Sequence, residues 1–511
     1  MPKFYITTAI PYASQLPHVG NCHDAVLCDA LARYHRLIGD EVFFLTGTDE
    51  HGQKIQRQAE KEGVTPQQLA DRVTNALKET WAMLGISNDA FIRTTDDFHV
   101  KTVQAIFQKL YDQGDIYKSS YEGWYCTPDE SFYTDSQALP GDSADTRKCP
   151  DCGRALERMG EDAYFFRLSK YAPELIRHIE NNPDFLLPES RKNEMINNFL
   201  KPGLQDLCVT RSTFDWGVPV PFDTRHVSYV WIDALSNYIT ALGFDPYGNH
   251  GELFRKFWPA ELHVVGKDVV RFHFLYWPCM LLALGIPLYK TLYGHGWHNY
   301  GADKMSKSTG NILYPGELAE TYGVDGLRYY MLREMPFSGD NAISAGQITL
   351  RYNTDLANDL GNLLSRTVAM CEKYFGGSLD TQSADPAVET VRKAAVSAYA
   401  ESMAGIKVQQ ALTEVWKLID RCNKFIDETM PWALAKDESK AGELRNVLAT
   451  LCRALHTVMI LVSPVMPGTA EKMASQLGLG DGMTAWKSLD AKDIAFRVKK
   501  DAPLFPRIEA S

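Results

Sequence analysis

The strongest constraint on the fold is an alternation of strand and helix patterns over residues 1–116. Residues 4–8 form a β-branched and aromatic run, a turn containing Pro and Ser follows, and helical periodicity continues to about residue 38. A second strand pattern, EVFFLTGTD, ends at Asp49 and leads into a polar helix. Such alternation is typical of a doubly wound parallel sheet, in which ligands bind beyond the carboxyl ends of the strands. His18 and Asp49 are therefore expected at the binding edge.

The alternation is interrupted once and then completed. A segment with its own glycines, aspartates and cysteines extends from residue 117 to about residue 222. After it come the strand pattern ELHVVGKD, an apolar helix over residues 269–284 and the strand pattern LYKTLYGHGW. We therefore predict an α/β fold with a doubly wound, Rossmann-like sheet, built from residues 1–116 and 223–301 and split by an inserted domain at residues 117–222.

The last third of the chain has a helical pattern only. After about residue 351 we find no strand pattern, and long amphipathic stretches such as VETVRKAAVSAYAESMAGI and ELRNVLATLCRALHTVMILV follow one another. These predict an all-α helix bundle over residues 351–511.

Composition limits the class of protein. The 511 residues, 45% apolar and 23% charged, suit a soluble protein of several domains. We find no signal sequence and no uninterrupted apolar run of ~20 residues, so a cytoplasmic protein with no membrane contact is expected. The net charge of −11 argues against a generally basic nucleic-acid binder but allows a local basic stripe. The ten cysteines are too sparse for a disulfide scaffold.

Two short motifs follow the first and the last strand of the predicted sheet. PHVGN places His18 and Gly20 at the start of the first helix, where a glycine permits close approach and the helix end favours anions. KMSKS, beginning at Lys304, offers two lysines and two hydroxyls after the last strand, which suits a triphosphate. Taken singly, each is also typical of an ordinary turn histidine or a solvated basic turn.

Together the motifs resemble the HIGH and KMSKS signatures of the class I aminoacyl-tRNA synthetases. The second match is complete; in the first, Val19 is conservative and Asn21 replaces a histidine. The resemblance implies that residues 302–350 form the KMSKS loop and a region contacting the tRNA stem. It further implies that charge on the ATP phosphates is stabilised by His18, Asn21, Lys304 and Lys307, with a weaker contribution from Asn21 because an amide carries no charge. The implied ATP site also includes Gly20, Gly266, Asp268 and Ser308.

Four stretches resemble the methionine enzymes of this class: TAIPYAS, TGTDEHG, YVWIDALSNY and GKDVVRFH. An apolar pocket with Trp231 and Tyr238 would suit a thioether, although two such aromatic residues are by themselves more typical of an ordinary core. Asp49 would pair with the substrate ammonium. The implied methionine site comprises Ala9, Ile10, Tyr12, Asp49, Trp231, Ala234, Leu235, Tyr238, Val269 and His273.

The insertion carries a cysteine pattern. Cys149 and Cys152 have the C-x-x-C spacing of a zinc knuckle, and Cys126 adds a third thiol. Related synthetases often have a second C-x-x-C pair here, and Asp129 stands in place of the missing cysteine. The sequence therefore leaves two interpretations open: a structural Zn²⁺ bound by three cysteines and Asp129, or a metal-free knuckle.

Three residues of the helical region match the family's anticodon readers. Asn362 and Arg366 lie four apart on one helical face, and Trp432 follows Met430 and Pro431 at the start of another helix. An exposed amide and guanidinium can read base edges, and an indole can stack on an unpaired base. Singly, each residue is more typical of ordinary helix packing.

The resemblance implies ATP- and Mg²⁺-dependent activation of L-methionine and its transfer to the 3′-terminal adenosine of initiator and elongator tRNA(Met). One alternative is a small-molecule nucleotidyltransferase, which has no use for a helical anticodon domain. Another is a tRNA-binding paralogue without catalysis, which Asn21 slightly favours. Leucine, isoleucine or valine enzymes would need a larger editing insertion. The sequence shows no β-barrel after the bundle, so a monomer is expected.

Overall fold

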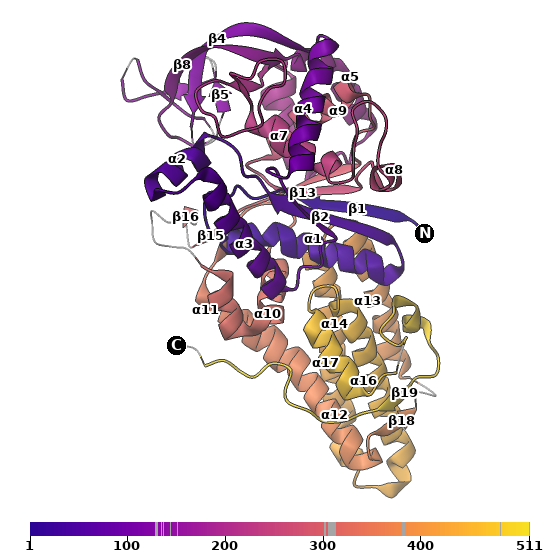
Figure 1. Cartoon of the computed structure of the whole chain (residues 1–511). Coiled ribbons are helices and arrows are strands. Elements are labelled where there is room, and N and C mark those ends of the chain that lie inside the picture. Colours follow the sequence, from indigo (N-terminus) through magenta and orange to yellow (C-terminus); the bar gives the residue numbers. More distant parts are fainter. Residues whose placement is uncertain are drawn as a thin grey trace.

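The computed structural model describes residues 1–127, 131–133, 135, 137–143, 145–150, 152–300, 303–304, 313–380, 384–480 and 482–509. Figure 1 shows three layers along the long axis of the molecule, with a β-rich region at one end, a sheet in the middle and a bundle of helices at the other end.

The central sheet has six parallel strands in the order β3-β2-β1-β13-β14-β9. Their bounds are β1 (Lys3–Thr8), β2 (Glu41–Thr48), β3 (Ala90–Arg93), β9 (Leu186–Leu187), β13 (Leu262–Gly266) and β14 (Thr291–His295). The predicted Rossmann-like sheet is confirmed. The edge strand β9 comes from the stretch that we assigned to the insertion, and its two residues are too few to show a strand period.

Helices cover both faces of this sheet. They are α1 (Val19–Ile38), α2 (Gln53–Glu62), α3 (Pro66–Leu84), α4 (Asp97–Asp112), α7 (Val230–Thr240), α8 (Glu252–Phe257), the π-helix η2 (Phe272–Tyr276) and α9 (Trp277–Leu284). Successive strand residues face opposite cores: Ile6 packs with the helices of one side and Tyr5 with those of the other. The strands are buried on both faces, as parallel strands require.

The inserted region contains a four-stranded sheet in the order β10-β8-β4-β5. Its antiparallel strands are β4 (Ile116–Cys126), β5 (Ser131–Tyr133), β8 (Glu157–Phe166) and β10 (Leu207–Cys208). Smaller elements of this region are β6 (Leu139–Pro140), β7 (Arg147–Lys148), α5 (Leu168–Asn181), α6 (Glu189–Met195), the π-helix η1 (Ile196–Leu200) and β11 (Thr210–Arg211). Strand β11 pairs with β12 (Val227–Ser228), which follows the inserted region.

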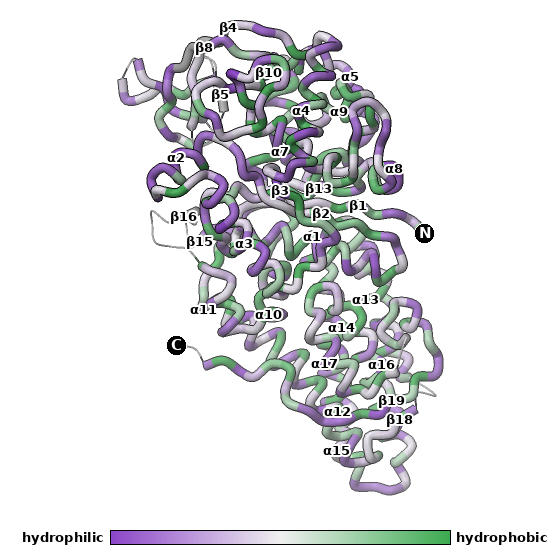
Figure 2. The backbone as a smooth tube through the Cα atoms, viewed as in Figure 1, coloured by the Kyte–Doolittle hydropathy of each residue, from purple (hydrophilic) through white to green (hydrophobic). Residues whose placement is uncertain are grey.

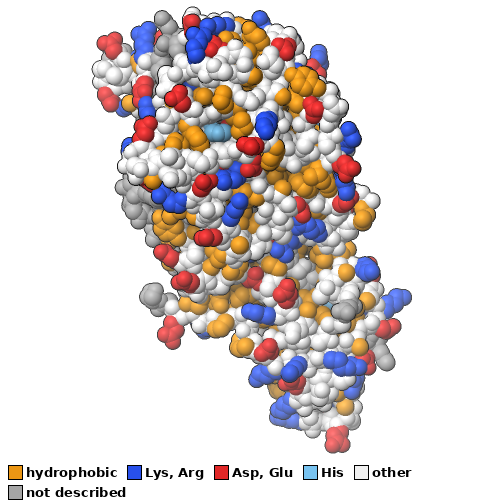
Figure 3. Space-filling view, in the orientation of Figure 1, with side chains coloured by type: hydrophobic (Ala, Val, Ile, Leu, Met, Phe, Trp, Pro, Cys, Tyr) orange, Lys and Arg blue, Asp and Glu red, His pale blue; other side chains and the backbone are white. Residues whose placement is uncertain are grey.

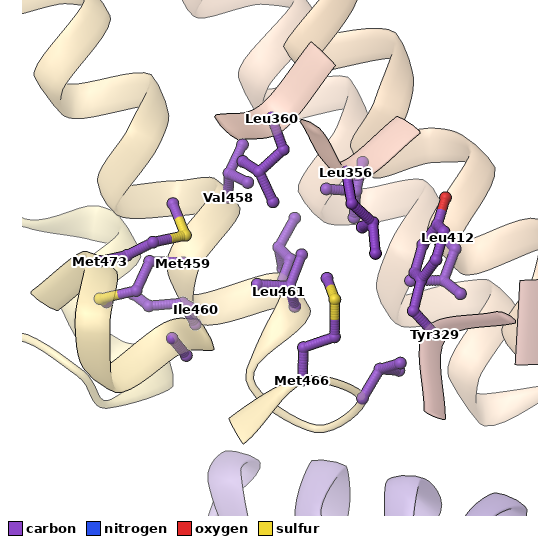
Figure 4. Close-up of a cluster of buried hydrophobic side chains, with 14 of the residues drawn as sticks. Tyr329, Leu356, Leu360, Leu412, Val458, Met459, Ile460, Leu461, Met466 and Met473 are labelled. Carbon is purple, nitrogen blue, oxygen red and sulfur yellow. The ribbon is translucent and has the colours of Figure 1, made fainter. Parts of the chain in front are cut away.

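The helical region is a bundle with a continuous apolar core. Its helices are α10 (Pro315–Glu334), α11 (Ala345–Arg351), the π-helix η4 (Tyr352–Gly361), α12 (Asn362–Phe375), α13 (Pro386–Ala404), α14 (Val408–Thr429), α15 (Pro431–Leu434), α16 (Ala441–Val462) and α17 (Pro467–Leu477). Figure 4 shows how Leu356, Leu412 and Leu461 from three of these helices converge. In Figure 2, by contrast, the solvent-facing α2 is mostly hydrophilic.

Two details of the bundle differ from expectation or need interpretation. Beyond residue 351 we expected no strand, yet β18 (Ser378–Asp380) pairs with β19 (Ala495–Arg497), because three-residue strands are too short to leave a pattern. Residues Glu438–Val462 form a helix long and apolar enough to cross a membrane, but 83% of its most apolar window is buried. This stretch is therefore explained by its place at the centre of the bundle.

Candidate functional site

The first motif forms the N-terminal cap of α1. His18 is the N-cap residue, and its Nδ1 accepts a hydrogen bond from the Gly20 backbone N–H at 3.1 Å. The proton of a neutral ring therefore lies on Nε2. The Asn21 Oδ1 accepts from the His18 backbone N–H at 3.2 Å, which completes a capping box. The structure thus gives Asn21 a local role that the sequence analysis did not foresee: it fixes the turn that carries His18.

Tyr12 and Asp49 meet where β1 and β2 end. An isolated parallel bridge joins the two residues, and the Ala13 backbone N–H donates to the Asp49 carbonyl at 2.8 Å. Asp49 is buried, with 7% of its surface exposed. Lys54 at the start of α2 lies 5.3 Å from the centre of the Tyr12 ring. A buried carboxylate at a strand end suits a substrate cation.

The predicted aromatic residues meet on α7 and η2. The Trp231 ring stacks on Phe272 at 3.7 Å between centroids and an interplanar angle of 6°. Val269 O and His273 Nδ1 are 3.0 Å apart, so Nδ1 carries the proton and donates it. The Tyr238 hydroxyl consequently donates to Nε2 at 2.7 Å. Burial lowers the pKa of His273 to about 4, so this ring is neutral at physiological pH.

The apolar members of the predicted methionine site share one core. Leu235 and Tyr238 are fully buried in the cluster that also contains Phe272, and four further predicted residues pack against it while remaining partly exposed. Those four are Ala9, Ile10, Trp231 and Val269. Ala234 is buried on the same helix. The structure therefore brings together residues from α7 and from the segments that follow β1 and β13.

A set of buried hydrogen bonds on α7, which we call the relay, was not predicted from the sequence. The two carboxylate oxygens of Asp233 bind His51 Nδ1 at 2.7 Å and His99 Nε2 at 2.8 Å, and His99 Nδ1 contacts Thr240 Oγ1 at 2.7 Å. Burial raises the pKa of Asp233, but the neighbouring His51 and His99 outweigh this and keep it below its usual value. The relay ties α7 to the loop after β2, which carries Asp49.

A second missed group is a cation fully buried in the wall of the insertion. Arg211 is 1% exposed, and its Nη1 donates to the Thr210 carbonyl at 2.7 Å. The guanidinium carbon lies 4.5 Å from the centre of the Tyr229 ring, two residues before Trp231. Neither residue type nor spacing distinguished this arginine in the sequence.

The predicted ribose turn follows β13. A Cβ on Gly266 would lie 2.6 Å from the Asp268 Oδ1, so a side chain there would displace the Asp268 carboxylate. Beside this turn, His295 Nε2 lies 2.5 Å from Asp24 Oδ1 on α1, and His295 Nδ1 donates to the Gly296 carbonyl at 2.7 Å. Burial lowers the pKa of His295, but the Asp24 carboxylate more than reverses this and raises it. The pair links α1 to the end of β14.

The KMSKS motif begins on a small three-stranded sheet. Strand β15 (His298–Tyr300) pairs with β16 (Asp303–Lys304) on one side and with β17 (Asn341–Ile343) on the other. The backbone of Lys304 therefore ends β16. Lys307 and Ser308 lie outside the described residues.

Three cysteines of the insertion converge. The Sγ atoms of Cys126, Cys149 and Cys152 all lie within 4.8 Å of one another, and the Cys126–Cys152 separation is 3.5 Å. Three sulfurs on a tetrahedral Zn²⁺ with 2.3 Å bonds would stand roughly 3.8 Å apart. The three thiols therefore fit zinc. Asp129, the expected fourth ligand, lies outside the described residues.

The three predicted anticodon residues lie at the far end of the bundle. The Arg366 guanidinium on α12 is 5.8 Å from the centre of the Trp432 ring on α15, and its Nη2 donates to Asp427 at 3.2 Å. Trp432 is 42% exposed, and Asn362 is exposed one turn before Arg366. Figure 3 shows Lys and Arg side chains gathered over this narrow end, with acidic side chains among them.

Comparisons with known proteins cover nearly the whole chain. The family described as tRNA synthetases class I (M) matches residues 4–368, and the family described as the anticodon binding domain of methionyl tRNA ligase matches residues 377–503. The methionine–tRNA ligases of Caldanaerobacter subterraneus subsp. tengcongensis and Clostridium tetani are 54% and 53% identical, and each alignment covers 99% of this chain and 79% or 78% of the relative.

Solved structures give the same result. Mycobacterium tuberculosis methionyl-tRNA synthetase in complex with methionyl-adenylate superposes with a TM-score of 0.95 at 38% identity, covering 99% of this chain and 100% of that one. The apo form of the same protein gives a TM-score of 0.87 at 35% identity, covering 100% and 99%.

Proposed function

Since the chain belongs to the class I methionine–tRNA ligases, which activate methionine with ATP and transfer it to tRNA, we propose which of its side chains carry out each step. In the first step the methionine carboxylate attacks the α-phosphorus of ATP, giving methionyl-adenylate and pyrophosphate. In the second, a ribose hydroxyl at the 3′ end of the tRNA attacks the activated carbonyl. Neither step needs a covalent bond to the enzyme, so positioning and charge stabilisation supply the rate.

Methionine binds between Asp49 and the aromatic residues of α7. The observation that carries this assignment is that Tyr12 and Asp49 lie beyond the carboxyl ends of the parallel strands β1 and β2, while Trp231 stacks on Phe272 in the helix that follows β13. Asp49 accepts the substrate ammonium, and Trp231 packs on the thioether. His273 is neutral and already bonded at both nitrogens, so its role is to hold the Tyr238 hydroxyl in place.

ATP binds across the start of α1 and the end of β13. His18 offers Nε2–H to the phosphates because its Nδ1 is occupied by the Gly20 backbone. Gly20 and Gly266 allow close backbone approach, and Asp268 accepts from ribose hydroxyls. Asn21 fixes the turn through Oδ1, while its amide N–H₂ is able to donate to ATP. Lys304, Lys307 and Ser308 complete the site and stabilise the leaving pyrophosphate.

Two metals accompany this assignment. Mg²⁺ enters with ATP and neutralises phosphate charge. Zn²⁺ would be held by Cys126, Cys149 and Cys152, with Asp129 as the fourth ligand, and would order the insertion without entering the reaction.

Asn362, Arg366 and Trp432 read the anticodon, with Trp432 stacking on an unpaired base. Charging of both initiator and elongator tRNA(Met), a monomeric state and a cytoplasmic location remain predictions.

The test is methionine-dependent exchange of labelled pyrophosphate into ATP, first with each of the twenty amino acids and then with two variants. Asp49→Asn should raise the KM for methionine by roughly 10- to 150-fold, the worth of a hydrogen bond to a charged group, with little change in the KM for ATP. Asp268→Asn should instead raise the KM for ATP, with little change in the KM for methionine. Exchange driven by another amino acid, or equal effects of both variants on both substrates, would contradict the assignment.

A further inference from the structure

One carboxylate outside the proposed site gathers donors from two other segments. Asp340 lies in the loop between α10 and β17, and both its oxygens lie 2.7 Å from Lys267 Nζ. The Trp297 backbone N–H also donates to Asp340 Oδ1, at 2.9 Å. Burial raises the pKa of Asp340, but these donors outweigh it and lower the pKa, so the group is charged at neutral pH.

The partners of Asp340 belong to the rim of the proposed ATP site. Lys267 is the middle residue of the turn from Gly266 to Asp268, and its Nζ lies 3.9 Å from the centre of the Trp297 ring. The Trp297 indole N–H donates to Asp268 Oδ1 at 3.3 Å. Lys267, Trp297, Asp268 and Asp340 thus form a closed set of contacts, which we call the rim latch.

The rim latch also reaches the base of the KMSKS loop. Asp340 directly precedes β17, and the Asn341 backbone N–H donates to the Trp297 carbonyl at 2.9 Å. β17 pairs with β15, and β15 pairs with β16, which ends at Lys304. A Cβ on Gly296 would lie 1.7 Å from the Gly339 carbonyl oxygen, so the two backbones are in direct contact. The placement of β16 is therefore tied to Asp340.

We propose that Asp340 is a positioning residue for methionine activation: through Lys267 and Trp297 it holds the ribose turn and the first residue of the KMSKS motif in one fixed arrangement. This inference rests on the ATP site proposed above. An ordinary pair with the exposure of Lys267 (18%) and Asp340 (36%) adds little to the stability of a fold and does not change its kinetics. A positioning pair acts on catalysis, because misplacement by about 1 Å can cost on the order of 100-fold.

Asp340→Asn and Lys267→Met test the proposal. The asparagine still accepts from the Trp297 backbone but loses the charge, and the methionine keeps the stem over the indole. Each should lower kcat/KM for ATP in pyrophosphate exchange by about 10- to 100-fold, while methionine affinity measured by calorimetry changes less than about twofold. The double variant should be no worse than the more severe single one, since both break one contact. Asp340→Glu should recover part of the activity.

The matched control is Glu414→Gln in α14, which removes an equally short two-oxygen contact with Lys417 at 2.8 and 2.9 Å. It should leave exchange unchanged. Normal exchange in both latch variants, or equal losses for ATP and methionine, would overturn the proposal. Asp268→Asn distinguishes a failure of this inference from a failure of the proposed ATP site. If Asp268→Asn also leaves the KM for ATP unchanged, the proposed ATP site is wrong. If Asp268→Asn raises that KM and the Asp340 and Lys267 variants do not, the site stands and the role of Asp340 is wrong.

Discussion

Arg328→Met should weaken the junction between the sheet and the helical bundle more than any exposed substitution. Arg328 on α10 is completely buried, and its Nη2 donates to Asp29 Oδ2 on α1 at 2.6 Å. Its Nε donates to the Val465 carbonyl at 2.8 Å and its Nη1 to the Leu84 carbonyl at 3.0 Å. One guanidinium thus joins α1, the end of α3 and the α16–α17 connection. Methionine keeps the apolar stem but supplies none of these donors.

The expected loss of stability depends on the partners that the Asp29 carboxylate keeps after Arg328 is replaced. Breaking a buried ion pair by removing one partner costs about 3–5 kcal/mol, because the remaining charge is uncompensated. Asp29 keeps two other partners, since the Arg33 Nε donates to it at 2.7 Å and the Ser87 backbone N–H donates at 2.7 Å. We therefore expect a loss near the lower end, about 3 kcal/mol. Asp29→Asn in the Arg328→Met background should cost less than in the wild type, with a coupling of at least about 1 kcal/mol.

Urea unfolding measured by circular dichroism gives the free energy of unfolding for each variant. Arg33→Met is the matched control, because Arg33 binds the same carboxylate but is 28% exposed, and it should cost under about 1 kcal/mol. A loss below about 1 kcal/mol for Arg328→Met, a loss equal to that of Arg33→Met, or strict additivity with Asp29→Asn would refute the reasoning.

Four further outcomes are expected. Tyr238→Phe leaves the buried His273 Nε2 without its donor and should reduce the free energy of unfolding by about 1–3 kcal/mol, as urea titration would measure. Purified protein should contain zinc by elemental analysis, and Cys152→Ser should lose it. Trp432→Ala should raise the KM for tRNA by roughly 5- to 150-fold without changing pyrophosphate exchange. Burial raises the pKa of Asp29, but its cationic partners outweigh burial and lower the pKa in the folded protein. The charged carboxylate therefore stabilises the fold above the ordinary carboxyl pKa, and this stabilisation is lost as the pH falls through the folded pKa. Acid titration from about pH 5 to pH 3 should destabilise the wild type more than Asp29→Asn.

Elements with a full period were predictable from the sequence, and very short ones were not. The strand over residues 4–8 and the helix to Ile38 are confirmed because each shows several repeats of its period. Strands β9, β18 and β19 have two or three residues each, so pairing with a distant strand, not local pattern, decides their existence.

The residues of the site also differ in whether a local sequence pattern could predict their positions. Asp49 could be placed because it directly follows a strand pattern, and the carboxyl ends of parallel strands share one edge. The contact between His51 and Asp233 could not, because 182 residues separate them and either residue alone is unremarkable. The rim latch depends on a lysine and an aspartate 73 residues apart. Such contacts are set by how the sheet edge, the loops and the helices pack, which no local spacing encodes.

Asn21 shows that one residue of a matched motif can have a different structural role from the residue usual at that position. From the sequence, Asn21 was expected to be a weaker ligand for ATP, because an amide carries no charge, and it slightly favoured a paralogue without catalysis. In the structure its Oδ1 accepts from the His18 backbone, and the His18 Nδ1 accepts from Gly20. The two bonds together orient the imidazole so that Nε2 is its donor. We therefore expect the uncharged Asn21 to support the phosphate contact proposed for His18, because Asn21 fixes the helix start while the Gly20 N–H fixes the tautomer of the imidazole.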